Sequence, residues 1–174
     1  DYYGIMKTLL PVERGEAVAG LKWLSETISE RMGVLVQRDL DLGRKMMGLH
    51  RRVLLAAAPW DFDSYMLFVE WNREPSKKFW PPRRRTLKPI ADDMQALADD
   101  KLDLLAISLP PGAGKSTLAI FYLTWLAGKY PDDPILTGSH SNSWIKGAYD
   151  ECLRIMDVRG DYLWSEVFPT VKVS

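Results

Sequence analysis

Apolar residues in the first third of the chain recur at intervals of three and four positions rather than two. They stand at Leu21, Leu24, Ile28, Val34, Leu35, Leu42, Met46, Met47 and Leu49. This spacing is typical of α-helix, although the glycines scattered among these residues lower the helix propensity. We predict a helical N-terminal region over residues 1–58 that ends at Pro59.

Two further helices are predicted before residue 100. Asp61 or Asp63 can cap a helix that runs to about Asn72. The second helix is indicated by one apolar face, with acidic and amide side chains on the opposite face. Its apolar residues are Leu87, Ile90, Ala91, Met94, Leu97 and Ala98.

The pattern changes in the second half of the chain, where short apolar runs alternate with helical segments. Residues 104–107 and 135–137 are predicted as buried strands, and residues 118–126 and 143–156 as helices. Strands joined in this order normally lie parallel in one sheet, with ligands at their carboxyl ends. We therefore expect an α/β domain, and the tail at residues 167–173 is predicted to begin another strand.

A glycine-rich run, Leu109-Pro-Pro-Gly-Ala-Gly-Lys-Ser-Thr117, connects the first predicted strand to the helix after it. The two glycines lack Cβ atoms, so the backbone can take positive φ and direct N–H groups at phosphate oxygens. Lys115 is placed to reach the β- and γ-phosphates, and the Ser116 hydroxyl to ligate Mg²⁺. The sequence thus predicts an ATP and Mg²⁺ site formed by Pro111, Gly112, Ala113, Gly114, Lys115, Ser116 and Thr117.

The run departs from the usual phosphate-loop signature at Leu109, where a glycine is expected. The intact Gly-Lys-Ser-Thr and the predicted flanking elements still favour a phosphate loop. The alternative is an ordinary glycine-rich turn between a strand and a helix that binds no ligand.

A basic segment precedes this loop. Residues 73–88 hold seven basic side chains against one acid, Glu74, with Phe79 and Trp80 interleaved. In one interpretation Arg83, Arg84 and Arg85 stack on adenine or contact phosphate, and the aromatic rings offer a base a stacking face. In the other the segment is a solvated loop.

Three further sites carry polar or reactive side chains. Ser139 and His140 follow the second predicted strand, where they could contact DNA or relay the state of the nucleotide, while Ser141 or Asn142 could instead cap a helix. His50 is predicted to be a surface residue near a helix end. Cys152 is predicted to pack in the interior, and the chain's two histidines and single cysteine do not predict a transition-metal site.

Composition adds limits rather than a function. Of 174 residues, 47% are hydrophobic and 26% charged, which is typical of a globular protein. The 23 basic and 23 acidic residues balance, so any contact with nucleic acid must be local. The sequence holds neither an apolar run long enough to span a membrane nor a signal-peptide pattern, and we expect a soluble, intracellular protein.

Hydrolysis of ATP at such a loop needs a second motif, an apolar strand that ends in Asp with a nearby Glu or equivalent. Residues 53–58 followed by Asp61 imitate it, but the alanines and Pro59 indicate a helix end. The chain begins at Asp1 rather than Met, so it either starts inside a longer protein or has lost a leader, and we expect the 174 residues to be part of a longer polypeptide. Such a portion should bind nucleotide with little or no turnover.

The order of four segments resembles the large subunit of tailed-phage terminases, over about residues 60–174. These segments are Trp71-Asn-Arg-Glu-Pro, then Phe79-Trp-Pro-Pro-Arg-Arg-Arg85, then the phosphate loop with its preceding Leu104-Leu-Ala-Ile-Ser, then Ile135-Leu-Thr-Gly-Ser-His-Ser141. The phosphate loop alone is shared by many ATPases, and the combination is more specific.

The resemblance implies an ATP-driven motor that pumps double-stranded viral DNA into a procapsid. Such proteins join a RecA-like α/β ATPase domain to a metal-dependent nuclease domain, and act in the host cytoplasm as a homo-oligomeric ring on the portal protein, with a small terminase subunit that selects the DNA and no membrane partner. By position, Gly112, Gly114, Lys115, Ser116 and Thr117 carry over as the nucleotide loop, with Lys115 and Ser116 as its catalytic members, and Arg83 to Arg85 as the segment near adenine.

This sequence departs from the terminase pattern in two respects. Pro110 and Pro111 occupy the part of the loop where many terminases carry an arginine, so that charge must come from elsewhere, for example from a neighbouring subunit. The acidic hydrolysis motif, the coupling motif and the nuclease domain are missing, so residues 59–174 would be an incomplete ATPase domain. Two alternatives remain, namely another P-loop ATPase of helicase-like type, or a non-catalytic module whose first 58 residues bind a partner.

Overall fold

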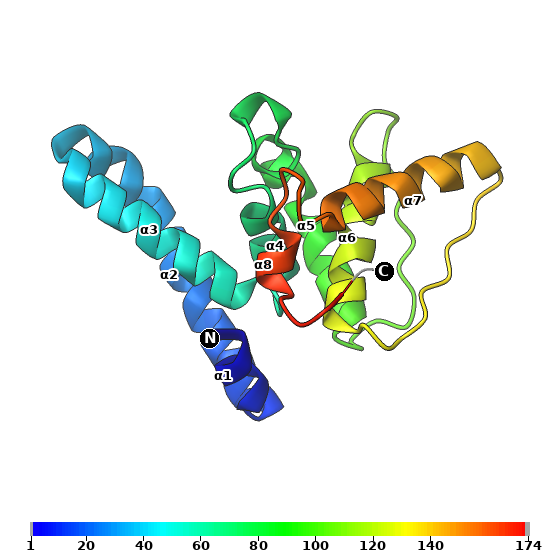
Figure 1. The fold of residues 1–174 in the computed structure, drawn as a ribbon, viewed down its shortest axis with the longest axis horizontal. Helices are drawn as coiled ribbons and strands as arrows, with labels where there is room; N and C mark the ends of the chain where they lie inside the picture. Colours follow the sequence, from blue (N-terminus) through cyan, green and yellow to red (C-terminus); the bar gives the residue numbers. More distant parts are fainter. Residues whose placement is uncertain (1, 173–174) are drawn as a thin grey trace. The chain divides into compact units, whose positions relative to one another are not determined.

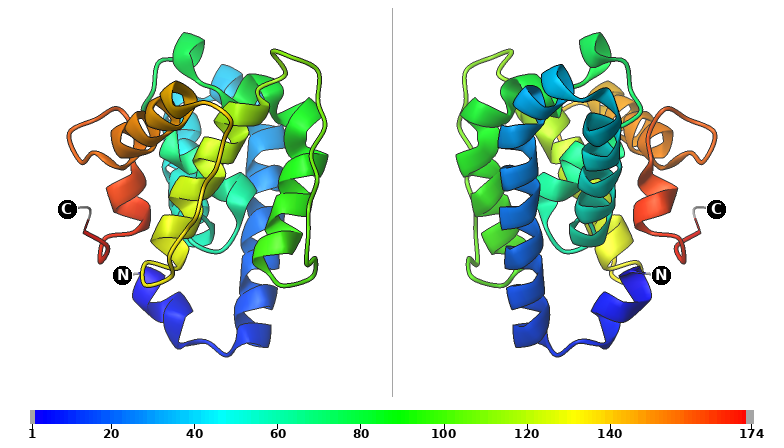
Figure 2. Two further views of the ribbon diagram at one scale, coloured as in Figure 1. Left: turned by 90° about the vertical axis from the view of Figure 1, so that its right-hand side faces the viewer. Right: turned by 90° about the vertical axis from the view of Figure 1, so that its left-hand side faces the viewer.

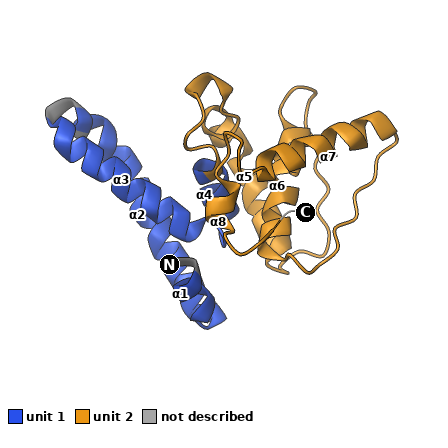
Figure 3. Ribbon diagram, viewed as in Figure 1, with its two compact units in different colours: residues 1–68 blue, residues 69–174 orange. Residues whose placement is uncertain are grey.

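The computed structural model describes residues 2–172, and within them the side chains of all residues except 2, 3, 35, 37 and 38, so that Leu35 of the predicted apolar pattern lies outside the described side chains. The described elements are α1 (Tyr2–Thr8), α2 (Pro11–Arg38), α3 (Leu40–Ala57), α4 (Phe62–Val69), the 3₁₀ turn η1 (Pro75–Lys77), α5 (Trp80–Ala98), α6 (Lys115–Lys129), α7 (Asn142–Met156) and α8 (Trp164–Val167) (Figure 1). The chain divides into two compact units, residues 1–68 and residues 69–174 (Figure 3). None of the helices in the described part combines the length and apolar character needed to cross a bilayer.

The predicted α/β fold with a parallel sheet is wrong for the described residues, which contain helices and connections but no strand. Residues 104–107 and 135–137 are drawn as extended connections (Figure 1). Leu104 is 83% exposed and Leu136 98% exposed. Each run lacks a neighbouring strand and a covering face within this part of the chain, and an isolated strand is not stable. At the tail, Val167 ends α8 instead of beginning a strand, and residue 173 lies outside the described residues.

The first unit is built around a hairpin of α2 and α3, which lie side by side (Figure 1). Asp39 forms the turn between them, and its carboxylate accepts from the amides of Asp41 and Leu42 at 2.9 and 3.1 Å, which caps α3. At Gly43 a Cβ atom would come within 2.9 Å of Val36 Cγ2. The two helices therefore approach closely at this end because one of the facing residues has no side chain.

His50 was predicted at the surface, and this is wrong. Its side chain is 7% exposed, and the ring Nε2 forms a hydrogen bond of 2.9 Å with Ser25 Oγ across the α2–α3 hairpin. A buried imidazole is tolerated when it has such a partner. His50 thus belongs to the interior of the first unit.

Asp61 caps α4 as the sequence predicted. Its Oδ2 accepts from the Ser64 amide at 2.9 Å and from the Ser64 hydroxyl at 2.6 Å, while Oδ1 pairs with Lys22 Nζ at 2.8 Å. The cap fixes where α4 starts, and the ion pair ties that start to α2 in the same unit.

In the second unit α6 is the most buried long helix. It contacts α5 and α7, and Figures 1 and 2 show it between them. Its tyrosine Tyr122 donates to the Met94 carbonyl of α5 at 2.8 Å, and burial raises the pKa of this phenol to about 12. On another side, Trp164 of α8 donates its indole N–H to the Thr124 carbonyl at 2.9 Å. Packing from several sides fixes the position of α6 and hence of its first turn.

Candidate phosphate-binding site

The glycine-rich run forms a tight loop that leads directly into α6. Gly112 and Gly114 have φ values of +80° and +98°, which glycine adopts readily and other residues rarely do. The Ala113 amide donates to the Pro110 carbonyl at 3.3 Å, and the Leu118 amide to the Gly114 carbonyl at 2.9 Å as the first bond of the helix. The two glycines stand on either side of Ala113, and turn backbone of this kind directly ahead of a helix can direct its N–H groups at an anion.

Gly114 is the N-cap residue of α6, and among the described side chains none caps this helix start. The first N–H groups of a helix have no partner within the helix and carry partial positive charge. Lys115 and Ser116 occupy this first turn and are exposed, while Thr117 is half-buried. The turn thus offers backbone amides, a cation and a hydroxyl to a solvent-borne anion.

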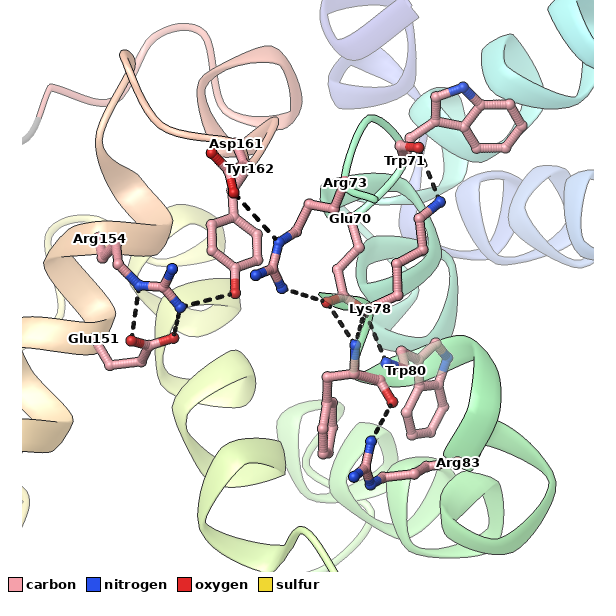
Figure 4. Close-up of polar contacts among 11 residues, drawn as sticks. Glu70, Trp71, Arg73, Lys78, Trp80, Arg83, Glu151, Arg154, Asp161 and Tyr162 are labelled. Atoms are coloured by element: carbon pink, nitrogen blue, oxygen red, sulfur yellow. Dashed lines mark hydrogen bonds and ion pairs between the residues drawn. The ribbon is translucent and has the colours of Figure 1, made fainter. Parts of the chain in front are cut away.

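The remaining predicted loop residues, Pro111 and Ala113, are exposed and half-buried respectively. Of the three arginines, Arg83 is placed beside the loop, because its Cδ lies 3.4 Å from where a Gly114 Cβ would stand. Its guanidinium donates to the Phe79 carbonyl at 3.3 Å and lies 5.1 Å from the centre of the Phe79 ring (Figure 4). Arg84 is half-buried and Arg85 exposed on the same helix α5, and their contacts with a ligand stay predictions.

The aromatic stacking face predicted at Phe79 and Trp80 is not formed. Phe79 is 9% exposed and Trp80 0%, so neither ring is open to a base. Phe79 instead stacks on Phe121 of α6, with ring centres 5.6 Å apart and 14° between the planes. Two large rings gain more from burial in the interior than from partial exposure on a basic segment.

Glu70 is a residue near the site that the sequence analysis missed. Its side chain is fully buried, and its carboxylate accepts from the amides of Phe79 and Trp80, the N-cap and the first residue of α5, each at 2.8 Å. Arg73 Nη1 donates to the same carboxylate at 3.0 Å (Figure 4). The one signal in the sequence was an acidic residue at the end of the apolar run in α4, a place where a charge is retained if it is paired.

Arg73 extends this cluster towards the C-terminal part of the unit. Its guanidinium lies 4.3 Å from the centre of the Tyr162 ring and 3.9 Å from an Asp161 oxygen. The Tyr162 hydroxyl in turn accepts from Arg154 of α7, which is also paired with Glu151 (Figure 4). Burial raises the pKa of the Tyr162 phenol above its usual value.

The segment after the second extended run contains a helix cap. Ser141 is the N-cap residue of α7, and its hydroxyl accepts from the Trp144 amide at 3.4 Å. Ser139 Oγ accepts from the Ser141 amide at 3.3 Å, and His140 is exposed. The capping interpretation is therefore confirmed for Ser141, while contacts of Ser139 and His140 with DNA stay predictions.

Other reactive groups do not add a second site. Cys152 is half-buried, and burial raises the pKa of its thiol to about 11, which makes it a poor nucleophile. The described residues contain no cluster of three or more His, Cys, Asp or Glu side chains suited to a metal ion. The loop at residues 110–117 with Arg83 is accordingly the arrangement best suited to a ligand.

Comparison with known proteins finds no family model, no curated protein and no solved structure that matches the chain.

Proposed function

We propose that residues 110–117 bind the phosphates of ATP together with Mg²⁺. The observation that carries the proposal is the backbone of the loop, where Gly112 and Gly114 both take positive φ immediately before the uncapped start of α6. An ordinary turn into a helix does not require two glycines in this conformation, whereas a loop that wraps a phosphate does.

The side chains around the loop fit the chemistry of the ligand. Lys115 supplies a mobile point charge for the outer phosphates, and the Ser116 hydroxyl supplies one oxygen to Mg²⁺, which takes its other ligands from phosphate and water. Arg83 lies on the α5 side of the loop and brings a second cation. This support comes from the loop and its neighbours and does not depend on a sheet.

The test is calorimetric titration of the chain with Mg²⁺ and the β,γ-imido analogue of ATP. We expect Lys115→Ala to weaken binding about tenfold or more, as expected for the loss of a hydrogen bond to a charged group. Lys146→Ala is the matched control, because it removes the same charge from an exposed position on α7. Equal affinities of Lys115→Ala and the unmodified chain would refute phosphate binding at this loop.

We further propose that the nucleotide drives packaging of double-stranded DNA, as in the large subunit of phage terminases. The support is the order of four segments, at residues 71–75, 79–85, 104–117 and 135–141. In that setting the partners are the portal protein, the small terminase subunit and further copies of the chain in a ring.

Steady-state phosphate release tests this wider activity. We expect the 174 residues to bind the ATP analogue but to turn ATP over slowly, because the acidic hydrolysis motif is missing from the sequence. Rapid turnover by the 174 residues would contradict this expectation.

The second candidate is a helical interaction module, and the all-helical architecture of the described residues fits it better than it fits an ATPase. The first unit exposes large apolar side chains, with Val12 75%, Trp23 67% and Ile5 61% exposed. It also holds a groove of about 490 Å³ lined by residues of α1, α2 and α3, most of them apolar, together with Arg52.

A pull-down with portal protein and small terminase subunit tests this candidate. If the first unit binds either of them, Trp23→Asp should abolish capture, whereas Val158→Asp, at a similarly exposed position of the second unit, should not. Retention of both partners by Trp23→Asp would remove the support from this surface.

A further inference from the structure

Phe79 joins the start of α5 to the loop that opens α6. Its main chain belongs to the N-cap of α5, while its ring reaches Gly114. A Cβ atom on Gly114 would come within 2.7 Å of Phe79 Cε2 and 3.1 Å of Cζ. The ring therefore fills the space beside the loop backbone at the position where φ is +98°.

Glu70 fixes the position of the Phe79 main chain. Both oxygens of the Glu70 carboxylate accept from the Phe79 amide, at 2.8 and 3.1 Å. Oε2 also accepts from the Trp80 amide, and Oε1 accepts from Arg73. A buried carboxylate with this many donors has one well-defined orientation, and so do the amides it holds.

The ring and carbonyl of Phe79 are also engaged. The ring stacks on Phe121, two turns along α6 from the loop, and the carbonyl accepts from Arg83. Movement of the Phe79 main chain would therefore shift both the ring that packs against Gly114 and the carbonyl that accepts from Arg83.

We propose that Glu70 is a positioning residue for the phosphate site and acts through Phe79. The carboxylate holds the first turn of α5, Phe79 packs against Gly114, and the loop keeps the backbone geometry that phosphate oxygens require. This inference rests on the proposed phosphate binding, but the conformation of the loop can be tested without any ligand. Glu70 itself need not touch the nucleotide.

Two variants test the proposal in the 174-residue chain. Phe79→Leu keeps an apolar side chain and removes the ring, and Glu70→Gln keeps the size and replaces one acceptor oxygen by an NH₂ group that faces the α5 amides. Trp164→Phe is the control, because it removes a buried hydrogen bond from the other side of α6 and so destabilises the same unit away from the loop.

The first measurement is the amide ¹H–¹⁵N spectrum of the ligand-free protein. Phe79→Leu and Glu70→Gln should shift the resonances of Gly112 and Gly114, and Trp164→Phe should leave them in place. The second measurement is titration with inorganic tripolyphosphate and Mg²⁺, in which the two test variants should bind about tenfold more weakly than the control variant.

The outcomes separate the two proposals. If Phe79→Leu leaves the glycine resonances and the tripolyphosphate affinity unchanged, the positioning role is wrong, whether or not Glu70→Gln folds. If the resonances shift but the unmodified chain binds neither tripolyphosphate nor the ATP analogue, the contact between Phe79 and the loop is real and the proposed function is wrong.

Discussion

The variant Gly114→Ala tests how closely the Phe79 ring packs against the loop. In Gly114→Ala the new Cβ keeps a backbone with φ of +98° and meets Phe79 Cε2 at 2.7 Å. Arg83 Cδ stands 3.4 Å away, in ordinary contact, so the aromatic ring is the obstacle. Because Phe79 is held by its amide and stacked on Phe121, the ring has little freedom to move aside.

Two costs add in this variant. A non-glycine residue in such a backbone region costs about 1–3 kcal/mol, and overpacking against a fixed ring costs about 1–3 kcal/mol more. Gly112→Ala is the matched control, since its φ is +80° and no atom lies within 4 Å of the new Cβ. We expect Gly112→Ala to carry only the cost of the backbone conformation, so the free energies of unfolding of the two variants should differ by about 1–3 kcal/mol.

Urea unfolding followed by tryptophan fluorescence gives the free energies of unfolding. The double variant Gly114→Ala with Phe79→Leu completes a cycle in which the smaller side chain should recover part of the cost. If Gly114→Ala is no less stable than Gly112→Ala, or if Phe79→Leu recovers nothing, the close packing of the ring on the loop is wrong, and the positioning role of Glu70 loses its basis.

Two more predictions concern α6 and α7. Gly128→Ala should destabilise the chain by about 1–3 kcal/mol in urea unfolding, because its Cβ would clash with the buried Phe168 ring. In the Gly128→Ala variant a smaller residue at 168 should recover part of this cost. Burial raises the pKa of the Cys152 thiol from 9.0 to about 11. At pH 8 the folded chain should therefore react with iodoacetamide about 100-fold more slowly than the urea-unfolded chain, because less of the thiol is ionised. The rate of the folded chain should rise as the pH approaches 11. A folded chain alkylated as fast as the unfolded one would show that the thiol is not protected.

Helical periodicity predicted many of the described helices, because apolar residues at this spacing mark the face of a helix that is buried. The apolar stripe at residues 87–98 lies in α5, and residues 118–126 lie in α6. The start of α5 at Trp80 was missed, since Pro81 and Pro82 suggested an interruption. Proline is accepted in the first turn of a helix, where the lost N–H has no partner within the helix. The cap that fixes this start comes from Glu70, ten residues upstream, and no local pattern contains it.

The strands were wrong for a related reason. A run of four apolar residues is compatible with a buried strand, but a strand is stable only beside another strand. The sequence of the run does not indicate whether such a neighbour exists. The same limit applies to side chains with two uses. Phe79 and His50 have types common at both surface sites and interiors, and their burial was decided by neighbours distant in sequence, Phe121 and Ser25.

At the candidate site the sequence correctly named the glycines that need positive φ, because that requirement is local. The terminase resemblance implied that Arg83 to Arg85 lie near adenine, and that contact stays a prediction, although Arg83 does lie beside the loop. Spacing alone left the three arginines between a ligand contact and a solvated surface. What the sequence did not show is the support behind the loop, which depends on two helix starts meeting in space.

These two helix starts are treated differently by the protein. At α5 the first amides are buried and bonded to an internal anion, the Glu70 carboxylate, whereas Gly114 provides no side-chain cap for the first amides of α6. If the loop binds phosphate as proposed, the anion is therefore drawn to the first amides of α6 and not to those of α5. Under that proposal Glu70, by occupying the first amides of α5, would restrict where an external negative charge can bind.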